Sequence, residues 1–364
     1  MTGLSCGIVG LPNVGKSTLF NALTKKAAAA ANYPFCTIDP NVGIVDVPDP
    51  RLAVLADLFD SQKIIPATIT FVDIAGLVKG ASEGEGLGNQ FLANIRETDA
   101  IVHVVRCFAE GDVIHVSGKV DPIADIEVIN LELILSDLQM VENIIGKLEK
   151  QARGKKELIP VLETLKKASA HLNESKPLRS LSVTEEERGY LNDYPFLTNK
   201  KVVYAANVSE NDLPTMENEY VQRVREYAAK EGNTVVPICA KLEEEIAQLD
   251  EKEALEFLQS LGVQETGLNR LIKEAFHTLG LITYLTAGEM EARAWTISRG
   301  TKAPEAAGKI HTDLQKGFIR AEVIAFDDLV THKGRVGARE AGKARSEGKD
   351  YVVRDGDVIL FFHN

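Results

Sequence analysis

A glycine-rich loop near the start of the chain carries residue types that bind phosphate. Residues 10–17 read GLPNVGKS, which matches G-x-x-x-x-G-K-[ST], between an apolar run at 4–9 and a helical pattern at 16–25. Backbone amides of such a loop hold phosphate oxygens, Lys16 reaches the β- and γ-phosphates, and the Ser17 hydroxyl can ligate Mg²⁺. The sequence therefore predicts a nucleoside triphosphate site. Its expected binding residues in this loop are Asn13, Val14, Gly15, Lys16, Ser17 and Thr18.

Two further positions have the chemistry of nucleotide switches. Asp73 ends an apolar run and begins D-x-x-G, in which the carboxylate holds a metal-bound water and the amide of Gly76 senses the γ-phosphate. Thr37 lies between this motif and the phosphate loop and is a candidate second ligand of Mg²⁺. A threonine in an ordinary turn is the alternative. The predicted metal ligands are thus Ser17, Thr37 and Asp73.

Alternating strand and helix patterns surround these motifs. Apolar, β-branched runs occupy residues 68–73 and 100–107, and similar runs return at 201–206 and 234–238. This alternation is typical of a mostly parallel sheet with helices on both faces. We therefore expect an α/β fold whose P-loop nucleotide-binding domain is interrupted and comprises residues 1–128 and 200–282.

The interruption and the C-terminal part have different patterns. Apolar residues three and four apart at 131–148 and 158–172 predict an antiparallel helical hairpin, inserted at 129–199. Two ordinary amphipathic helices of the main domain are the alternative. Residues 283–364 are expected to form a small β-rich domain. Its expected strands are 293–297, 318–324, 351–353 and 358–362, and residues 243–261 before it read as one helical stretch.

The composition narrows the class of protein. The 364-residue chain has a net charge of −12, which argues against uniform attraction to nucleic acid or an anionic membrane. Its four cysteines are far apart and fit no metal-binding spacing, as expected of a reduced, cytoplasmic protein. The apolar run near the start is broken by Gly7 and Gly10, so neither a signal peptide nor a membrane partner is expected.

Longer stretches around these motifs resemble the Obg-like P-loop proteins. The matching runs are 10–18, 34–41 and 73–92, and they are most similar to the YchF subfamily, the Obg-related ATPases of the TRAFAC class. Residues 292–297, 309–311 and 348–351 resemble a TGS domain, so the resemblance covers essentially the whole chain. It implies an interrupted G domain, a helical insertion and a C-terminal TGS-like domain. It also implies a preference for ATP over GTP and association with the ribosome, for which we expect the large subunit.

The base-reading loop departs from that of ordinary GTPases. Their N-K-x-D motif uses the Asp to accept hydrogen bonds from guanine, whereas residues 207–210 here read NVSE. Val208 thus replaces the Lys and the longer Glu210 replaces the Asp, which removes the guanine reader. Asn207 and the Val208 backbone are then expected to bond the N6/N7 edge of adenine, and Ala240 belongs to the next base loop. A loosened guanine site that still takes GTP is the alternative.

The residue that positions the attacking water is not the usual one. Ras-like enzymes carry a Gln directly after D-x-x-G, but Leu77 stands there and cannot hydrogen-bond. His115, in a glycine-containing stretch, is the candidate catalytic residue, with a structural His as the alternative. Asn13 has two interpretations: in potassium-activated relatives an Asn at this place ligates K⁺, and otherwise it caps the loop. The absence of the catalytic Gln favours slow turnover or dependence on a partner.

Three functions remain open on these residues. The first is an ATP-hydrolysing switch on the ribosome, and the second is a GTPase of the same fold with a drifted base loop. The third is a nucleotide-gated module that binds RNA or protein. Residues 333–349 hold six Lys or Arg against Glu340 and Glu347, and on a TGS-like domain they could contact ribosomal RNA. A solvated loop balanced by acidic neighbours is the alternative.

Overall fold

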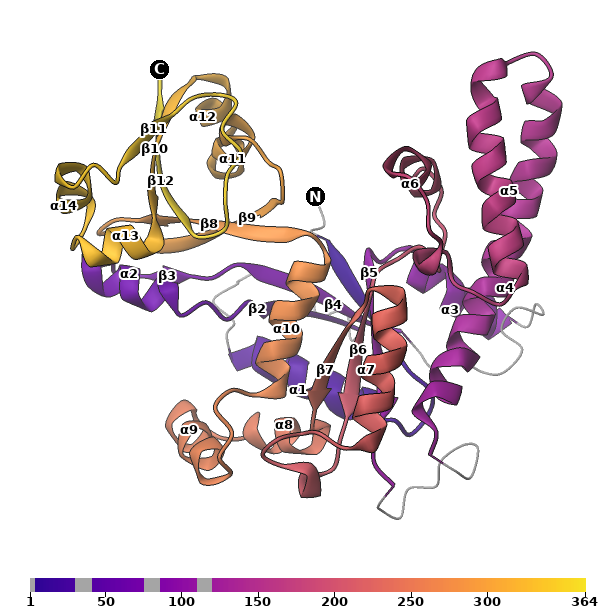
Figure 1. Ribbon diagram of the computed structural model, residues 1–364. Helices are drawn as coiled ribbons and strands as arrows, with labels where there is room; N and C mark the ends of the chain where they lie inside the picture. Colours follow the sequence, from indigo (N-terminus) through magenta and orange to yellow (C-terminus); the bar gives the residue numbers. More distant parts are fainter. Residues whose placement is uncertain (1–3, 30–40, 75–85, 110–119) are drawn as a thin grey trace. The chain divides into compact units, whose positions relative to one another are not determined.

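The computed structural model describes residues 4–29, 41–74, 86–109 and 120–364 (Figure 1). They divide into two compact units, drawn from residues 1–45 with 70–275 and from residues 46–69 with 276–364. Among the described helices, none is long and apolar enough to cross a bilayer. The predicted α/β class is confirmed, because strands and helices alternate through the first unit and the second is rich in strands.

A six-stranded sheet in the order β2-β4-β1-β5-β6-β7 forms the centre of the first unit. Every residue of β5 and β6 is buried, which explains why both read as continuous apolar runs. Because β4, β1, β5, β6 and β7 run parallel, the loops that follow them meet at one edge of the sheet. The strands are β1 (Ser5–Val9), β2 (Val42–Asp46), β4 (Thr68–Asp73), β5 (Ala100–Arg106), β6 (Val202–Asn207) and β7 (Thr234–Ile238).

Helices bury their apolar faces against this sheet and one another. Side chains from several of them join the strands in one core, among them Ile95, Ile129 and Val224. The stretch expected as one helix at 243–261 is divided in two, because Asp250 caps the start of a new helix. The helices are α1 (Lys16–Ala29), α3 (Gly86–Arg96), α7 (Glu219–Glu231), α8 (Ala240–Ile246), α9 (Glu251–Ser260) and α10 (Gly267–Thr278).

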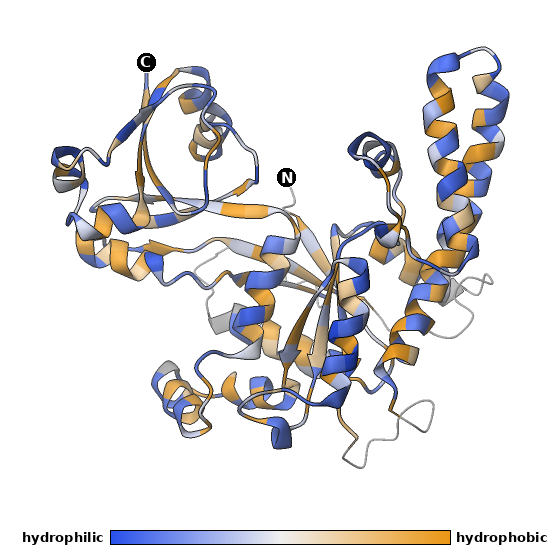
Figure 2. Ribbon diagram, in the orientation of Figure 1, coloured by the Kyte–Doolittle hydropathy of each residue, from blue (hydrophilic) through white to orange (hydrophobic). Residues whose placement is uncertain are grey.

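A long helical hairpin extends the first unit. Its first helix, α4 (Pro122–Ala152), begins after the capping residue Asp121 and packs its first half into the core around the sheet. Its second half pairs with α5 (Ile159–Asn173) through a separate apolar seam, and α6 (Glu185–Asn192) follows. Hydrophobic and hydrophilic residues alternate along both helices (Figure 2). The helix therefore starts before residue 129, because its first turns belong to the nucleotide-binding core.

The second unit contains a mixed sheet in the order β11-β10-β12-β8-β9-β3. Residues 351–353, expected as a strand, form only a single bridge between Val352 and Lys302. Short helices cover this sheet, and the small side chains of α11 pack onto it. The elements are α2 (Arg51–Phe59), β3 (Ile64–Ile65), β8 (Leu281–Ala287), β9 (Ala292–Ser298), α11 (Ala303–Ile310), α12 (Thr312–Lys316), β10 (Phe318–Ala325), α13 (Phe326–Thr331), α14 (Arg335–Glu340), β11 (Arg345–Glu347) and β12 (Asp357–His363).

Residues 46–69 lie in this second unit, although the expected boundaries place them in the nucleotide-binding domain. Strand β3 pairs with β9 and is the outermost strand of the sheet. The Arg51 guanidinium, 2.8 Å from Asp49, also donates to Asp355 at 3.0 Å and to the Thr283 hydroxyl at 3.2 Å. The segment therefore covers one sheet edge and is tied to the end of the chain by a charged residue.

Candidate nucleotide-binding site

The predicted phosphate and base loops line one cleft of about 1110 Å³ in the first unit. They lie after β1, β6 and β7, which are parallel, and ligand clefts of α/β sheets form at this end of the strands. The cleft includes all but one of the nucleotide-binding residues predicted here. Those in its lining are Asn13, Gly15, Lys16, Ser17, Thr18, Asn207, Val208, Glu210 and Ala240.

Backbone geometry shapes the phosphate loop. Asn13 has a φ of 64° and Gly15 a φ of +98°, both in the left-handed region. A Cβ atom on Gly15 would lie 2.2 Å from Nδ2 of Asn207, so only glycine fits there. The Val14 side chain is buried in the protein, and its carbonyl accepts a bond from Asn207. Val14 therefore contributes to this site through its backbone, since its side chain belongs to the core.

The two charged groups expected to act on phosphate and metal are paired with each other. The Lys16 ammonium donates to the Asp73 carboxylate, and both side chains are largely shielded from solvent. Ser17 follows Lys16 in the first turn of α1. Thr37, Gly76 and His115 lie outside the described residues.

Ser17 and Asp73 suit Mg²⁺ by their chemistry. Each offers a hard oxygen donor, and Mg²⁺ at phosphate sites uses one or two protein ligands and completes its shell with phosphate oxygens and water. Within the described residues, no group of three His, Cys, Asp or Glu side chains is assembled to hold a metal. The donors present therefore fit a magnesium ion held jointly with a nucleotide.

Asn207 joins the phosphate loop to the base loop. Its Nδ2 donates to the Val14 carbonyl at 2.9 Å, and its Oδ1 accepts from the Ala240 amide at 3.0 Å. The Val208 amide donates to the Ile238 carbonyl at 2.8 Å. The Nδ2 group has a second N–H and Oδ1 a second lone pair, so these bonds leave the expected adenine contacts of Asn207 and of the Val208 backbone as a prediction. Asn207 is a brace between loops.

The rim of the base loop carries an ion pair. Lys241 donates to Glu210 at 2.5 Å, and this contact raises the pKa of the lysine. Ser209 and Asp212 cap the short turn that presents Glu210. The Glu210 carboxylate thus has a cationic partner within the protein. Cys239, directly before Ala240, is buried, and burial raises the pKa of its thiol.

Two residues of this region were not predicted from the sequence. Phe108 lines the cleft just after β5, where the Arg106 guanidinium stacks on its ring at 4.6 Å. Glu243 is buried in α8, and burial raises its pKa to about 7, although amides of Gly267 and Leu268 hydrogen-bond to it. Its Oε1 has no hydrogen-bond partner among the described residues. Phe108 could have been predicted, because it is an aromatic residue that directly follows an apolar strand. Glu243 could not, because nothing in the sequence distinguishes it from the two glutamates that follow it.

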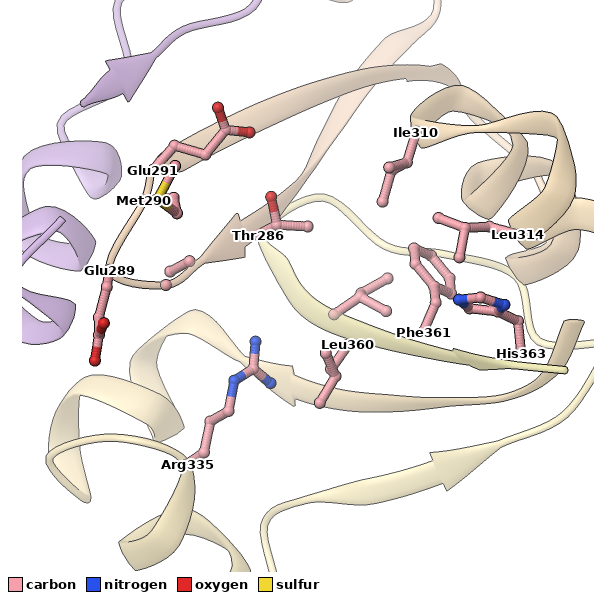
Figure 3. A pocket seen from close by; sticks show the side chains of 13 residues that line it. Thr286, Glu289, Met290, Glu291, Ile310, Leu314, Arg335, Leu360, Phe361 and His363 are labelled. Atoms are coloured by element: carbon pink, nitrogen blue, oxygen red, sulfur yellow. The ribbon is translucent and has the colours of Figure 1, made fainter. Parts of the chain in front are cut away.

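A second cavity, of about 470 Å³, lies within the C-terminal unit (Figure 3). Met290 and Glu291 of the β8–β9 turn border one side of it, and Leu360 and Phe361 of β12 border another. Its lining is mainly apolar, and the Arg335 guanidinium is 3.5 Å from the Glu322 carboxylate. None of the predicted nucleotide- or metal-binding residues lies in it.

The basic stretch at 333–349 is largely neutralised. Four of its six cations form ion pairs with carboxylates, as the balanced-loop alternative requires. The pairs are Arg335 and Arg339 with Glu322, Lys343 with Asp328, and Arg345 with Glu347 and Asp357. Within the described residues, no ion pair joins Lys333 or Lys349 to an acid. Most of the positive charge expected to face RNA is therefore paired with carboxylates of the same unit.

Known proteins resemble the chain over its whole length. The family described as 50S ribosome-binding GTPase matches residues 5–144, and the C-terminal family of YchF GTPases, a protein of unknown function, matches residues 281–364. The ribosome-binding ATPase YchF of Escherichia coli O157:H7 is 57% identical over 363 residues, covering 100% of this chain and 99% of that protein. Its counterpart in Bacillus subtilis is 55% identical, covering 99% of each chain.

A solved structure agrees with these sequences. The YchF GTPase of Schizosaccharomyces pombe matches with a TM-score of 0.88 and 39% identity, covering 100% of this chain and 99% of that one. The phosphate loop, the hairpin and the C-terminal sheet all lie within that match. Identity at this level over the full length shows that the chain belongs to the YchF family.

Proposed function

We propose that the protein is a P-loop ATPase that binds and slowly hydrolyses ATP with Mg²⁺, prefers ATP to GTP, and acts as a switch on the ribosome. The cleft supports the ATPase activity, because Lys16 and Ser17 line it together with the base-loop residues Asn207–Glu210, and Lys16 is paired with Asp73. The relatives named ribosome-binding ATPase support the action on the ribosome.

The observation that carries the base preference is that Val208 is buried and that Glu210 is paired with Lys241. Val208 is 2% exposed and contributes to the core, so it does not provide the lysine stem that lies along a guanine base. Glu210 has its carboxylate 2.5 Å from Lys241. A carboxylate that already accepts from an ammonium is a weaker reader of guanine N1–H and N2. The loop therefore lacks the two features that favour guanine.

At the phosphates, the residues have distinct tasks. With a nucleotide bound, Lys16 would exchange its bond to Asp73 for phosphate oxygens, and Ser17, Asp73 and Thr37 would hold Mg²⁺. When bound, the ion would supply positive charge against the developing charge on the phosphate. Gly76 senses the γ-phosphate, and His115 positions water in place of the absent glutamine. With Leu77 after D-x-x-G, slow turnover follows, and Asn13 is a candidate ligand for K⁺.

A GTPase of the same fold is the second candidate, because the solved relative is titled a GTPase. Titration calorimetry with ATP and GTP in excess Mg²⁺ separates the two. The wild-type chain should bind ATP more tightly. The double variant Val208→Lys with Glu210→Asp should shift the ratio toward GTP by about tenfold, the scale of one hydrogen bond to a charged group. A wild-type preference for GTP would refute ATP selection by this loop.

Ribosome binding rests on the relatives and on the family description, which names the 50S subunit. It implies a cytoplasmic protein that contacts the large subunit. The TGS-like domain at 283–364 is our proposed contact with RNA, through the exposed Lys333 and Lys349. Changing both to Ala should weaken co-sedimentation with 50S particles, whereas Lys252→Ala in α9 should not. Equal sedimentation of both variants would remove this contact from the proposal.

A further inference from the structure

A groove separate from the nucleotide cleft lies between helices α3 and α4 of the first unit. It has a volume of about 840 Å³ and is made of described residues only. From α3 it takes Asn89, Leu92 and Arg96, which are three and four residues apart and so share one helix face. From α4 it takes a stripe between Leu135 and Lys147, about 18 Å long at 1.5 Å per residue. We call it the α3–α4 groove.

The charge of this groove is opposite to that of the protein. Its lining contains Arg96 and Lys147 and no carboxylate, in a chain of net charge −12. Arg96 donates to the Ser136 hydroxyl at 3.1 Å, and its buried Nε has no hydrogen-bond partner among the described residues. Asp137 accepts from the Leu197 and Thr198 amides at 2.9 and 2.7 Å and also attracts Arg96, so its carboxylate partly balances the charge of that guanidinium. Asp137 is not in the lining, however, so both charged side chains that line the groove are cations, and Lys147 is exposed.

Apolar side chains lie between the two cations. Leu135 is 41% exposed although it faces the groove, and Met140 and Ile144 are half-buried beside it. The amides of Gln139 and Asn143 alternate with them along α4. An occupant that inserts apolar side chains and places acidic groups on either side would cover Leu135 and pair with both cations.

We propose that the α3–α4 groove docks an acidic amphipathic helix of a protein partner. A helix of about 12 residues matches the length of the α4 stripe. Two cations over about 18 Å are too few for a nucleic-acid backbone, which carries a charge every few ångströms and has no use for exposed leucine. The proposal is independent of the base preference argued above, because none of the groove residues lines the nucleotide cleft.

The test uses the full chain and a displayed library of helical peptides of about 14 residues. The strongest selected peptide, labelled with fluorescein, is then measured by anisotropy against single variants. Two changes lie in the groove, Lys147→Glu and Leu135→Asp. Two matched controls lie on α4 outside its lining, Lys150→Glu and Leu131→Asp, and Leu131 is exposed to 45%. Circular dichroism establishes that each variant is folded.

The proposal expects selected peptides rich in Asp and Glu with apolar residues three and four apart. Lys147→Glu should weaken binding about threefold to fivefold and Leu135→Asp about tenfold, with less than about twofold for either control. Basic or unpatterned peptides would overturn the proposal, and so would equal losses in groove and control variants. A polyuridine RNA that bound with the same variant dependence would assign the groove to nucleic acid instead. Failure to select any binder tighter than about 100 μM would also count against it.

Discussion

Replacing Asn207 with Ala should loosen the nucleotide site without touching a phosphate-binding atom. The change removes the bond from Nδ2 to the Val14 carbonyl and the bond from the Ala240 amide to Oδ1. Asn207 is 5% exposed, so both partners are left unpaired in the interior. Each buried group that loses its partner costs about 1–3 kcal/mol. The free energy of unfolding should therefore fall by about 2–6 kcal/mol.

ATP affinity should fall as well, because the brace holds the phosphate loop against the base loop. Even a part of that loss, about 1.4 kcal/mol, raises the dissociation constant tenfold. Urea denaturation measures the first quantity and calorimetric titration with ATP the second. Asn173→Ala is the matched control, since it removes one exposed amide bond to Ser169 in the hairpin and should cost less than about 0.5 kcal/mol. If Asn207→Ala matched this control in both assays, the bracing role would be refuted.

Three further changes test other parts of the structure. Lys16→Ala should abolish ATP binding in a filter assay, because Lys16 is the phosphate-loop cation, and normal binding would remove the loop from the site. His115→Ala should lower ATP turnover with little change in ATP affinity, and unchanged turnover would exclude this residue from catalysis. Glu243 has a pKa of about 7 when folded against 4.5 as its ordinary value, so the folded state binds the extra proton between these pH values. Wild-type stability should then fall by about 2–3 kcal/mol from pH 4.5 to 7 relative to Glu243→Gln, as measured by urea denaturation at each pH, and parallel curves would contradict the assigned pKa.

The phosphate loop was predictable because its chemistry is contained in eight consecutive residues. The brace at Asn207 was not, since its partners Val14 and Ala240 are far from it in sequence and only the fold brings them together. The adenine contacts assigned to Asn207 and the Val208 backbone stay a prediction, because these two bonds use only one N–H and one lone pair of the Asn207 amide. A motif shows which residues are present, but it does not show which hydrogen bonds the protein has already formed.

The basic stretch at 333–349 illustrates a second limit. Its charge was counted along the chain, whereas Glu322, Asp328 and Asp357 approach it from other elements of the sheet and its helices. Similarly, the residues of α2 and β3 were assigned to the first domain by strand–helix alternation. Strand β3 has only two residues, too few for any periodicity to reveal that its partner is β9.

The place of residues 46–69 also has a consequence for synthesis. Chains emerge from the N-terminus first, so α2 is made long before β9 and Asp355, to which this segment is joined. Leu52 and Leu55 of α2 are buried in the folded protein. The strands β8 and β9, which pack against α2, are translated much later, so these side chains are exposed until then. A truncated product that stops before residue 281 would lack β8 and β9, so the apolar side chains of α2 would stay exposed. Exposed apolar side chains of this kind are what chaperones and proteases recognise.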